Sequence, residues 1–255
     1  MEAVLVQWDI AWEDKPANYT QVAQLLKATP AAPGSLIVLP EMFATGFSMN
    51  TAATVEVPNG TTEVFLQELA QTYQSAVIAG VAVRDNSGMV RNQALAISPE
   101  GTLLARTTKQ RSFSVADEGK FYTQGNAAEL FDYAGFRCAL FLCYDLRFPE
   151  LFRAAVAQGA TLFLVLANWP LARQHHWLTL LQARAIENQA CVIGVNRTGR
   201  DPQASYGGRS VMIDPRGEIV ADAGDGARVL VAALEPSWVH HWRAEFPALR
   251  DAQLR

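Results

Sequence analysis

The chain has 255 residues, half of them apolar, and a formal net charge of -4. A chain of this length forms one large domain or two small ones and can bury a sizeable core. The mildly acidic balance and the scattered lysines and arginines argue against a nucleic-acid-binding protein and against a polybasic membrane patch.

Strands and helices are predicted to alternate along the first half of the chain. Short apolar runs indicate strands, and apolar residues at helical spacing indicate amphipathic helices. The predicted strands are 4–8, 36–39, 76–83, 93–97 and 102–107, and the predicted helices cover 19–26 and 65–73. A polar, irregular segment follows from 109 to 126. It is long for a connection in a compact domain, and such loops tend to be functional.

The second half continues the alternation. The predicted strands are 137–142, 161–167, 191–195, 210–213, 218–221 and 229–234, and the predicted helices are 149–158, 175–188 and a short one at 238–242. Because there is no linker or repeat, residues 1–255 are predicted to form a single α/β domain. A layered sandwich of two sheets flanked by helices fits this order, and so does a doubly wound sheet.

Several features indicate where the protein works. No apolar stretch approaches the roughly 20 residues that span a bilayer. The N-terminal segment lacks the basic region and cleavage site of a signal peptide. Three cysteines at unrelated spacings do not form a disulfide framework, which indicates a reducing compartment. We therefore expect a cytoplasmic protein that does not associate with a membrane.

Three chemically distinctive residues each follow a predicted strand. Glu41 follows the strand that ends at Leu39, Lys109 follows the strand that ends at Thr107, and Cys143 follows the strand that ends at Leu142. Ligands of α/β folds usually bind at strand ends. One acid, one cation and one thiol are therefore predicted to converge there.

These three side chains suit nucleophilic catalysis. The reactive form of a cysteine is its thiolate, and a neighbouring carboxylate can take the thiol proton and return it to a leaving amine. Lys109 would lower the pKa of the thiol by its charge and stabilise an oxyanion, which the backbone N–H of Tyr144 could also bind. A purely structural role for each of the three residues stays open at this point, since a lone strand-end cysteine is often a core residue and a lone charge is often solvated.

Three segments in order resemble the signature segments of the nitrilase (carbon–nitrogen hydrolase) superfamily. They are LPEMF at 39–43, Lys109, and CYDLRFPE at 143–150, and DPRGE at 214–218 resembles a late hairpin of the same family. The resemblance covers nearly the whole chain. It implies a four-layer αββα sandwich.

The resemblance also implies roles for particular residues. Glu41 is expected to be the general base, Lys109 the oxyanion stabiliser and Cys143 the nucleophile that forms a thioester. A second glutamate after the lysine usually positions lysine and substrate, and Glu118 matches it, although Asp117 lies beside it.

Further segments resemble the bacterial omega-amidase branch. They are TGF at 45–47, ADE at 116–118, ANWP at 167–170 and ARAIENQ at 183–189. Similar proteins hydrolyse the terminal amide of 2-oxoglutaramate or 2-oxosuccinamate to the acid and ammonia. An amidase for another small aliphatic amide or an N-carbamoyl compound is the main alternative, and an inactive binding protein is a third. A true nitrilase fits the segment after Cys143 less well.

A substrate with a free carboxylate needs a cation in its pocket. Arg147 and Arg173 are the candidates for a bidentate contact, and they could instead be a structural ion pair and a solvated surface residue. Phe43, Phe121 and Trp169 are candidate walls of a small pocket, or ordinary core residues.

The remaining reactive residues are set aside. The adjacent pairs His175-His176 and His240-His241 lack the spacing of a zinc site, and a cysteine–histidine pair is unnecessary beside Glu41 and Lys109. No metal and no cofactor is expected.

The chain is also predicted to associate with copies of itself. Similar proteins are usually at least dimers, so a homodimer or a higher homo-oligomer is expected. Trp238 and Trp242, in the tail that begins at about 236, are candidate contact residues.

Overall fold

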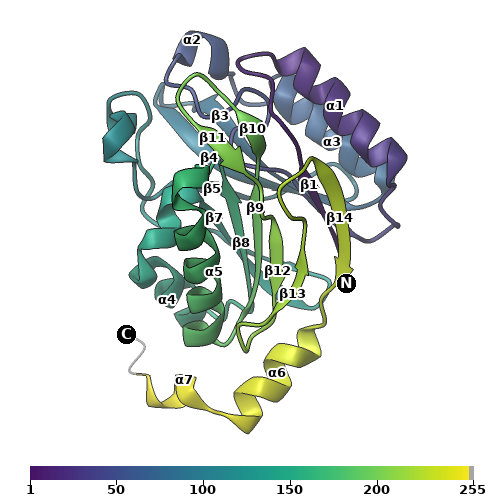
Figure 1. Cartoon of the computed structure of the whole chain (residues 1–255), viewed down its shortest axis with the longest axis vertical. Helices are drawn as coiled ribbons and strands as arrows, with labels where there is room; N and C mark the ends of the chain where they lie inside the picture. The colour runs from purple at the N-terminus through teal and green to yellow at the C-terminus, as the bar shows by residue number, and fades with distance from the viewer. Residues whose placement is uncertain (253–255) are drawn as a thin grey trace.

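The computed structural model of the chain describes residues 1–252 and has four layers (Figure 1). Two six-stranded sheets pack face to face. Helices α1 (Lys15–Ala28) and α3 (Thr61–Tyr73) cover the outer face of the first sheet, and α4 (Pro149–Ala157) and α5 (Gln174–Asn188) cover that of the second. The predicted αββα sandwich is confirmed, and the doubly wound alternative is wrong.

The first sheet contains strands from both ends of the chain. In spatial order they are β14 (Arg228–Ala233), β1 (Glu2–Gln7), β2 (Leu36–Val38), β3 (Ala76–Arg84), β4 (Val90–Ile97) and β5 (Leu103–Thr108). The pairs β1–β2 and β2–β3 are parallel, and β3–β4 and β4–β5 are antiparallel. The parallel strands β1 to β3 thus lie in the interior of the sheet.

The second sheet repeats this plan with the later half of the chain. Its order is β13 (Ile219–Asp222), β12 (Val211–Ile213), β9 (Cys191–Asn196), β8 (Leu162–Ala167), β7 (Phe136–Leu142) and β6 (Leu130–Tyr133). Again the central strands β7 to β9 are parallel. The short strand β6 was not predicted, and neither was the two-stranded hairpin of β10 (Thr198–Arg200) and β11 (Ser205–Gly207).

The central strands are apolar except near their ends because both of their faces are buried. Successive side chains of a strand point to opposite faces. In β7, Leu140 and Leu142 enter the core between the sheets, whereas Ala139 and Phe141 pack under α4 and α5. The continuous apolar runs in the sequence thus reflect a sheet that is sandwiched between two layers.

The remaining elements are short or terminal. They are α2 (Thr51–Thr54), the 3-10 turns η1 (Ser114–Ala116), η2 (Glu118–Lys120), η3 (Cys143–Arg147) and η4 (Leu171–Arg173), and the terminal helices α6 (Pro236–Glu245) and α7 (Ala248–Asp251). Trp238 packs against the core between the sheets, and Trp242 stacks on Phe246 at 5.5 Å. No helix within residues 1–252 is long and apolar enough to cross a membrane.

Candidate active site

The strand-end residues converge as expected. Glu41 lies just beyond β2, Lys109 directly after β5, and Cys143 directly after β7. Lys109 Nζ donates to Glu41 Oε1 at 2.8 Å, and Lys109 and Cys143 line the same cavity. Two sheets therefore contribute to one site.

Lys109 forms a buried ion pair with two carboxylates. Its Nζ lies 3.0 Å from both Oε1 and Oε2 of Glu118, in addition to its contact with Glu41. The three side chains are at most 4% exposed. Burial lowers the pKa of Lys109, but the negative charges of Glu118 and Glu41 outweigh burial, and the net pKa lies above the ordinary value. Lys109 is therefore charged.

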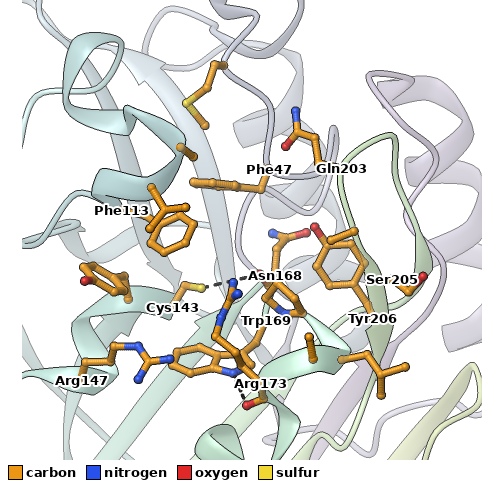
Figure 2. A pocket seen from close by; sticks show the side chains of 18 of the residues that line it. Phe47, Phe113, Cys143, Arg147, Asn168, Trp169, Arg173, Gln203, Ser205 and Tyr206 are labelled. Carbon is orange, nitrogen blue, oxygen red and sulfur yellow. Dashed lines mark hydrogen bonds between the residues drawn. The ribbon is translucent and has the colours of Figure 1, made fainter.

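Cys143 occupies a strained position at the start of η3. Its φ is 43°, in the left-handed region that residues with a side chain seldom adopt. Backbone strain of this kind is often found at functional sites. Its Sγ lies 3.8 Å from the backbone oxygen of Asn168 and faces the cavity (Figure 2). The turn therefore presents the sulfur to a ligand.

The protonation state of the thiol follows from burial and two neighbouring charges. Burial raises the pKa of Cys143 well above its ordinary value, and the charge of Glu41 raises it further, whereas Lys109 lowers it. The prediction that the charge of Lys109 lowers this pKa is confirmed, but burial and Glu41 outweigh that effect. The thiol is therefore neutral, and a base is needed to form the thiolate.

Two asparagines that sequence reasoning did not assign hold the carboxylates. Asn168 donates its backbone N–H to Glu41 Oε2 at 3.1 Å and its Nδ2 to the backbone oxygen of Glu41 at 2.6 Å. Asn92 donates its Nδ2 to Glu41 and to Glu118. Asn168 belongs to the ANWP segment and could have been found there, whereas Asn92 lies within a strand and gives no local signal.

A buried aspartate joins the turn that carries Cys143 to the segment after Lys109. The Asp145 carboxylate accepts from the backbone N–H groups of Leu142, Gln110 and Arg111 at distances of 2.8–3.4 Å. These contacts fix Lys109 and Cys143 relative to each other.

The cavity beside Cys143 has a volume of about 750 Å³ and mostly apolar walls. The aromatic rings of Phe47, Phe113, Trp169 and Tyr206 surround it, and Tyr144 also lines it (Figure 2). The ring centroid of Phe47 lies 4.8 Å from Lys109 Nζ. The site thus suits a small ligand with apolar stretches.

Arg147 and Arg173 bring two positive charges to this cavity. The Arg147 guanidinium lies 4.8 Å from the Trp169 ring, and that of Arg173 lies 5.6 Å from the Phe113 ring. Within residues 1–252 neither arginine forms an ion pair with a carboxylate. The expected structural ion pair of Arg147 is therefore wrong, and both charges are available to a ligand.

Two of the predicted aromatic walls lie elsewhere. Phe43 is fully buried among Trp8, Tyr19 and Phe65, with ring centroids 6.1–6.5 Å apart. Phe121 is 42% exposed and outside the cavity. The assignment of Phe43 to the pocket is corrected: Phe43 belongs to the core between the first sheet and its helices.

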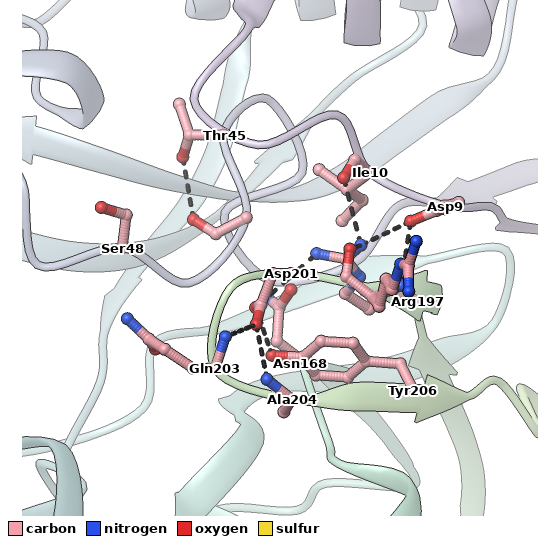
Figure 3. A network of polar contacts seen from close by, with 12 residues as sticks. Asp9, Ile10, Thr45, Ser48, Asn168, Arg197, Asp201, Gln203, Ala204 and Tyr206 are labelled. Carbon is pink, nitrogen blue, oxygen red and sulfur yellow. Dashed lines mark hydrogen bonds and ion pairs between the residues drawn. The ribbon is translucent and has the colours of Figure 1, made fainter.

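The hairpin of β10 and β11 supplies one wall of the cavity. A network of polar contacts stabilises this hairpin (Figure 3). The buried Arg197 donates to Asp9 Oδ1 at 2.7 Å, and its guanidinium lies 4.5 Å from the Tyr206 ring. Tyr206 in turn donates its hydroxyl to Asp201 at 2.6 Å. Sequence reasoning missed this wall because the strands of the hairpin have three residues each.

No group of three or more His, Cys, Asp or Glu residues suited to a metal ion occurs in the described part of the chain. His175 and His176 lie at the start of α5, and His176 Nδ1 lies 3.2 Å from Arg147 Nη2.

Comparisons with known proteins agree with this geometry. A sequence model of the carbon-nitrogen hydrolase family matches residues 3–244. Omega-amidase YafV of Yersinia enterocolitica is 39% identical over 98% of this chain and 96% of its own length. The 2-oxoglutaramate amidase of Bacillus subtilis is 31% identical over 96% of this chain and 95% of its own length.

A solved structure is also similar. XC1258 of Xanthomonas campestris, a CN-hydrolase superfamily protein with an arsenic adduct in its active site, superposes with a TM-score of 0.93. It is 33% identical, over 99% of this chain and 97% of that chain. The chain therefore belongs to the carbon–nitrogen hydrolase family, within the nitrilase superfamily. It is a hydrolase that acts on amides.

Proposed function

We propose that the protein hydrolyses the terminal amide of a small 2-oxo dicarboxylic acid monoamide, such as 2-oxoglutaramate or 2-oxosuccinamate, and releases ammonia. The observation that carries this proposal is the pair of arginines without carboxylate partners, Arg147 and Arg173, in a mostly apolar cavity beside Cys143. A guanidinium binds a carboxylate in a bidentate manner. The names omega-amidase and 2-oxoglutaramate amidase among the relatives support the same substrate class.

The proposed reaction begins with the neutral thiol. Glu41 takes the proton of Cys143 while sulfur attacks the amide carbon, and Lys109 and the Tyr144 backbone N–H stabilise the oxyanion. Glu41 then protonates the departing nitrogen, and a thioester remains on Cys143. Glu41 then takes a proton from a water molecule that attacks the thioester. The carbon–sulfur bond breaks, the acid is released, and the proton on Glu41 returns to the sulfur of Cys143. The covalent route replaces one difficult step by two easier ones.

Glu118 is proposed to hold Lys109 in place during these steps. Both of its oxygens contact Lys109 Nζ, and Oε2 also accepts from the backbone N–H of Phe113 at 2.6 Å. Phe113 is itself a wall of the cavity. Glu118 thereby connects the position of the oxyanion stabiliser to the shape of the pocket.

The carboxylate contact is tested by changing each arginine to glutamine. We expect the variant that lacks the carboxylate-binding arginine to lose about 10- to 100-fold in kcat/KM on 2-oxoglutaramate, because a charge-assisted contact contributes about 1.5–3 kcal/mol. On a neutral amide without the carboxylate the same variant should retain wild-type activity. Equal losses on both substrates in both variants would contradict this proposal.

The alternatives make different predictions in the same assay. A protein that prefers another small aliphatic amide or an N-carbamoyl compound would release ammonia fastest from substrates without a 2-oxo acid. An inactive binding protein would release none. The assembled Glu41, Lys109, Glu118 and Cys143 argue against the inactive protein.

We also propose that the chain associates with copies of itself, as a homodimer or a higher homo-oligomer, and that the tail from about 236 contributes to the contact. Of the two candidate contact residues, Trp238 packs against the protein's own core. The Arg216 guanidinium lies 4.3 Å from the Trp242 ring.

A further inference from the structure

Asn92 lies between the two carboxylates of the site. Its Nδ2 is 2.8 Å from Glu41 Oε1 and 3.1 Å from Glu118 Oε1. Asn92 is 1% exposed, belongs to β4 and does not line the cavity. It therefore acts on the carboxylates and not on a ligand.

The orientation of the Asn92 amide follows from charge. Within residues 1–252 its Oδ1 has no hydrogen-bond partner, yet a flipped amide would place that oxygen against two carboxylates. The donor side must therefore face Glu41 and Glu118, and the NH2 group has one hydrogen for each. The backbone oxygen of Asn92 also accepts from the backbone N–H of Lys109 at 2.9 Å, which ties its position to that of the lysine.

The two oxygens of Glu41 have different surroundings. Oε1 accepts from Lys109 Nζ at 2.8 Å and from Asn92 Nδ2 at 2.8 Å. Oε2 accepts only from the backbone N–H of Asn168, at 3.1 Å, among the described residues. Two donors occupy Oε1, so a proton that arrives at Glu41 is accommodated at Oε2.

We propose that Asn92 is a positioning residue for the general base: together with Lys109 it occupies Oε1 of Glu41, so that Oε2 is the atom that carries the transferred proton. The inference rests on the proposed role of Glu41 in amide hydrolysis. The thiol proton moves to Oε2 as the sulfur–carbon bond forms. It moves from Oε2 to the amide nitrogen as the carbon–nitrogen bond breaks, and Glu41 regains its charge.

Asn92 has a second effect, because two carboxylates share one lysine. The titratable groups around the pair are Lys109, Cys143 and Tyr122, and the Asp145 carboxyl, whose pKa burial raises to about 7, interacts with Lys109. Burial raises the pKa of Tyr122 to about 12, so that it is neutral. Lys109 alone leaves the cluster with a net negative charge, and the Asn92 hydrogens stabilise both ionised carboxylates. Without these hydrogens, Lys109 would be the one side chain among the described residues that bonds to both carboxylates.

The test is the pH dependence of kcat/KM in two variants, measured with any amide that the wild type hydrolyses. Asn92→Leu removes the donor at nearly constant volume, and Asn92→Asp replaces it with a third carboxylate of the same shape. We expect the leucine variant to lose about 10- to 100-fold in kcat with KM within about threefold, since acid–base catalysis contributes about 10²- to 10⁴-fold. Its acidic limb should move to higher pH, because the ionised carboxylates lose a hydrogen-bond donor. The aspartate variant should show the larger shift.

Gln93→Leu is the matched control. Gln93 is the next residue of β4, is 4% exposed, and bonds to Thr108 and Arg106 instead of the glutamates. Its loss should change stability but leave the acidic limb in place.

Each outcome decides the inference. A folded Asn92 variant whose activity falls equally at every pH, with an unmoved acidic limb, would overturn it and leave Asn92 with a structural role only. If the leucine variant does not fold, the pH dependence of kcat/KM in the aspartate variant tests the inference. A wild type that hydrolyses no amide at all would refute the proposed function instead, so the two failures are distinguishable.

Discussion

At the scale of single residues, the neutral thiol of Cys143 is the central chemical feature. Burial and the charge of Glu41 together outweigh Lys109. Cys138 and Cys191 are buried in strands, and their pKa values are also raised, chiefly by burial. Cys143 alone of the three faces a cavity and has a base nearby, so reactivity follows from the partner and not from a preformed thiolate.

The neutral state of the Cys143 thiol can be tested by titrating the thiolate. The pKa of Cys143 in the folded protein lies well above its ordinary value. The ultraviolet thiolate absorbance of wild type minus Cys143→Ser should therefore show no step at about pH 8.5, where an exposed cysteine titrates. In denaturant the difference should show that step at about pH 8.5. A step at or below about pH 8.5 in the folded protein would mean that the charge of Lys109 outweighs burial and Glu41.

Single residues also show how much of the site can be predicted from the sequence. Glu41, Lys109 and Cys143 were singled out because each places a reactive group at a strand end, and the resemblance to the nitrilase superfamily implied their roles. Phe43 was misplaced because Met42, with a φ of 43°, turns the chain, and Phe47 lines the pocket instead. A reversal of that kind depends on backbone geometry that composition does not reveal.

At the scale of elements, the turn that carries Glu41 packs directly on β3. An added Cβ at Gly80 would lie 2.5 Å from Glu41 Cα and 2.6 Å from the backbone nitrogen of Met42. The backbone N–H of Gly80 donates to Pro40, and its oxygen accepts from Phe43. Gly80 is therefore required for close approach of two backbones.

Gly80→Ala should accordingly displace Glu41. A shift of about 1 Å at a reacting group costs about 100-fold in rate, and overpacking a core costs about 1–3 kcal/mol of stability. Steady-state kinetics at a temperature where the variant is folded would measure the first effect. Gly226→Ala is the control, because its Cβ would meet no atom within 4 Å. Wild-type kinetics in Gly80→Ala would show that this contact does not position Glu41.

The elements that escaped prediction share a physical cause. The strands β6, β10 and β11 have three or four residues each, too few for a periodic pattern to be distinct. The hairpin of β10 and β11 is held by Arg197, which donates to Asp9, far away in the sequence, and contacts the ring of Tyr206. The Tyr206 hydroxyl also donates to Asp201. Tyr206 therefore enters the pocket without any local signal.

At the scale of the whole molecule, the site exists only because two sheets stack. Glu41 comes from the first sheet, and Asn168 and Cys143 come from the second; the 2.6 Å contact between Asn168 Nδ2 and the Glu41 backbone oxygen joins them. The alternation of strands and helices indicated an α/β fold. It could not separate one sheet from two, because sheet partners such as β14 and β1 lie at opposite ends of the chain.

The central claim is that this arrangement hydrolyses a 2-oxo acid amide through Cys143. It is tested most directly by ammonia release from 2-oxoglutaramate, with wild type and Cys143→Ala measured side by side at equal concentration. We expect steady release from the wild type and a loss of at least about 10³-fold in the variant, as for removal of a catalytic nucleophile. Release that persists undiminished in Cys143→Ala would contradict the mechanism, and the absence of release from the wild type would contradict the substrate.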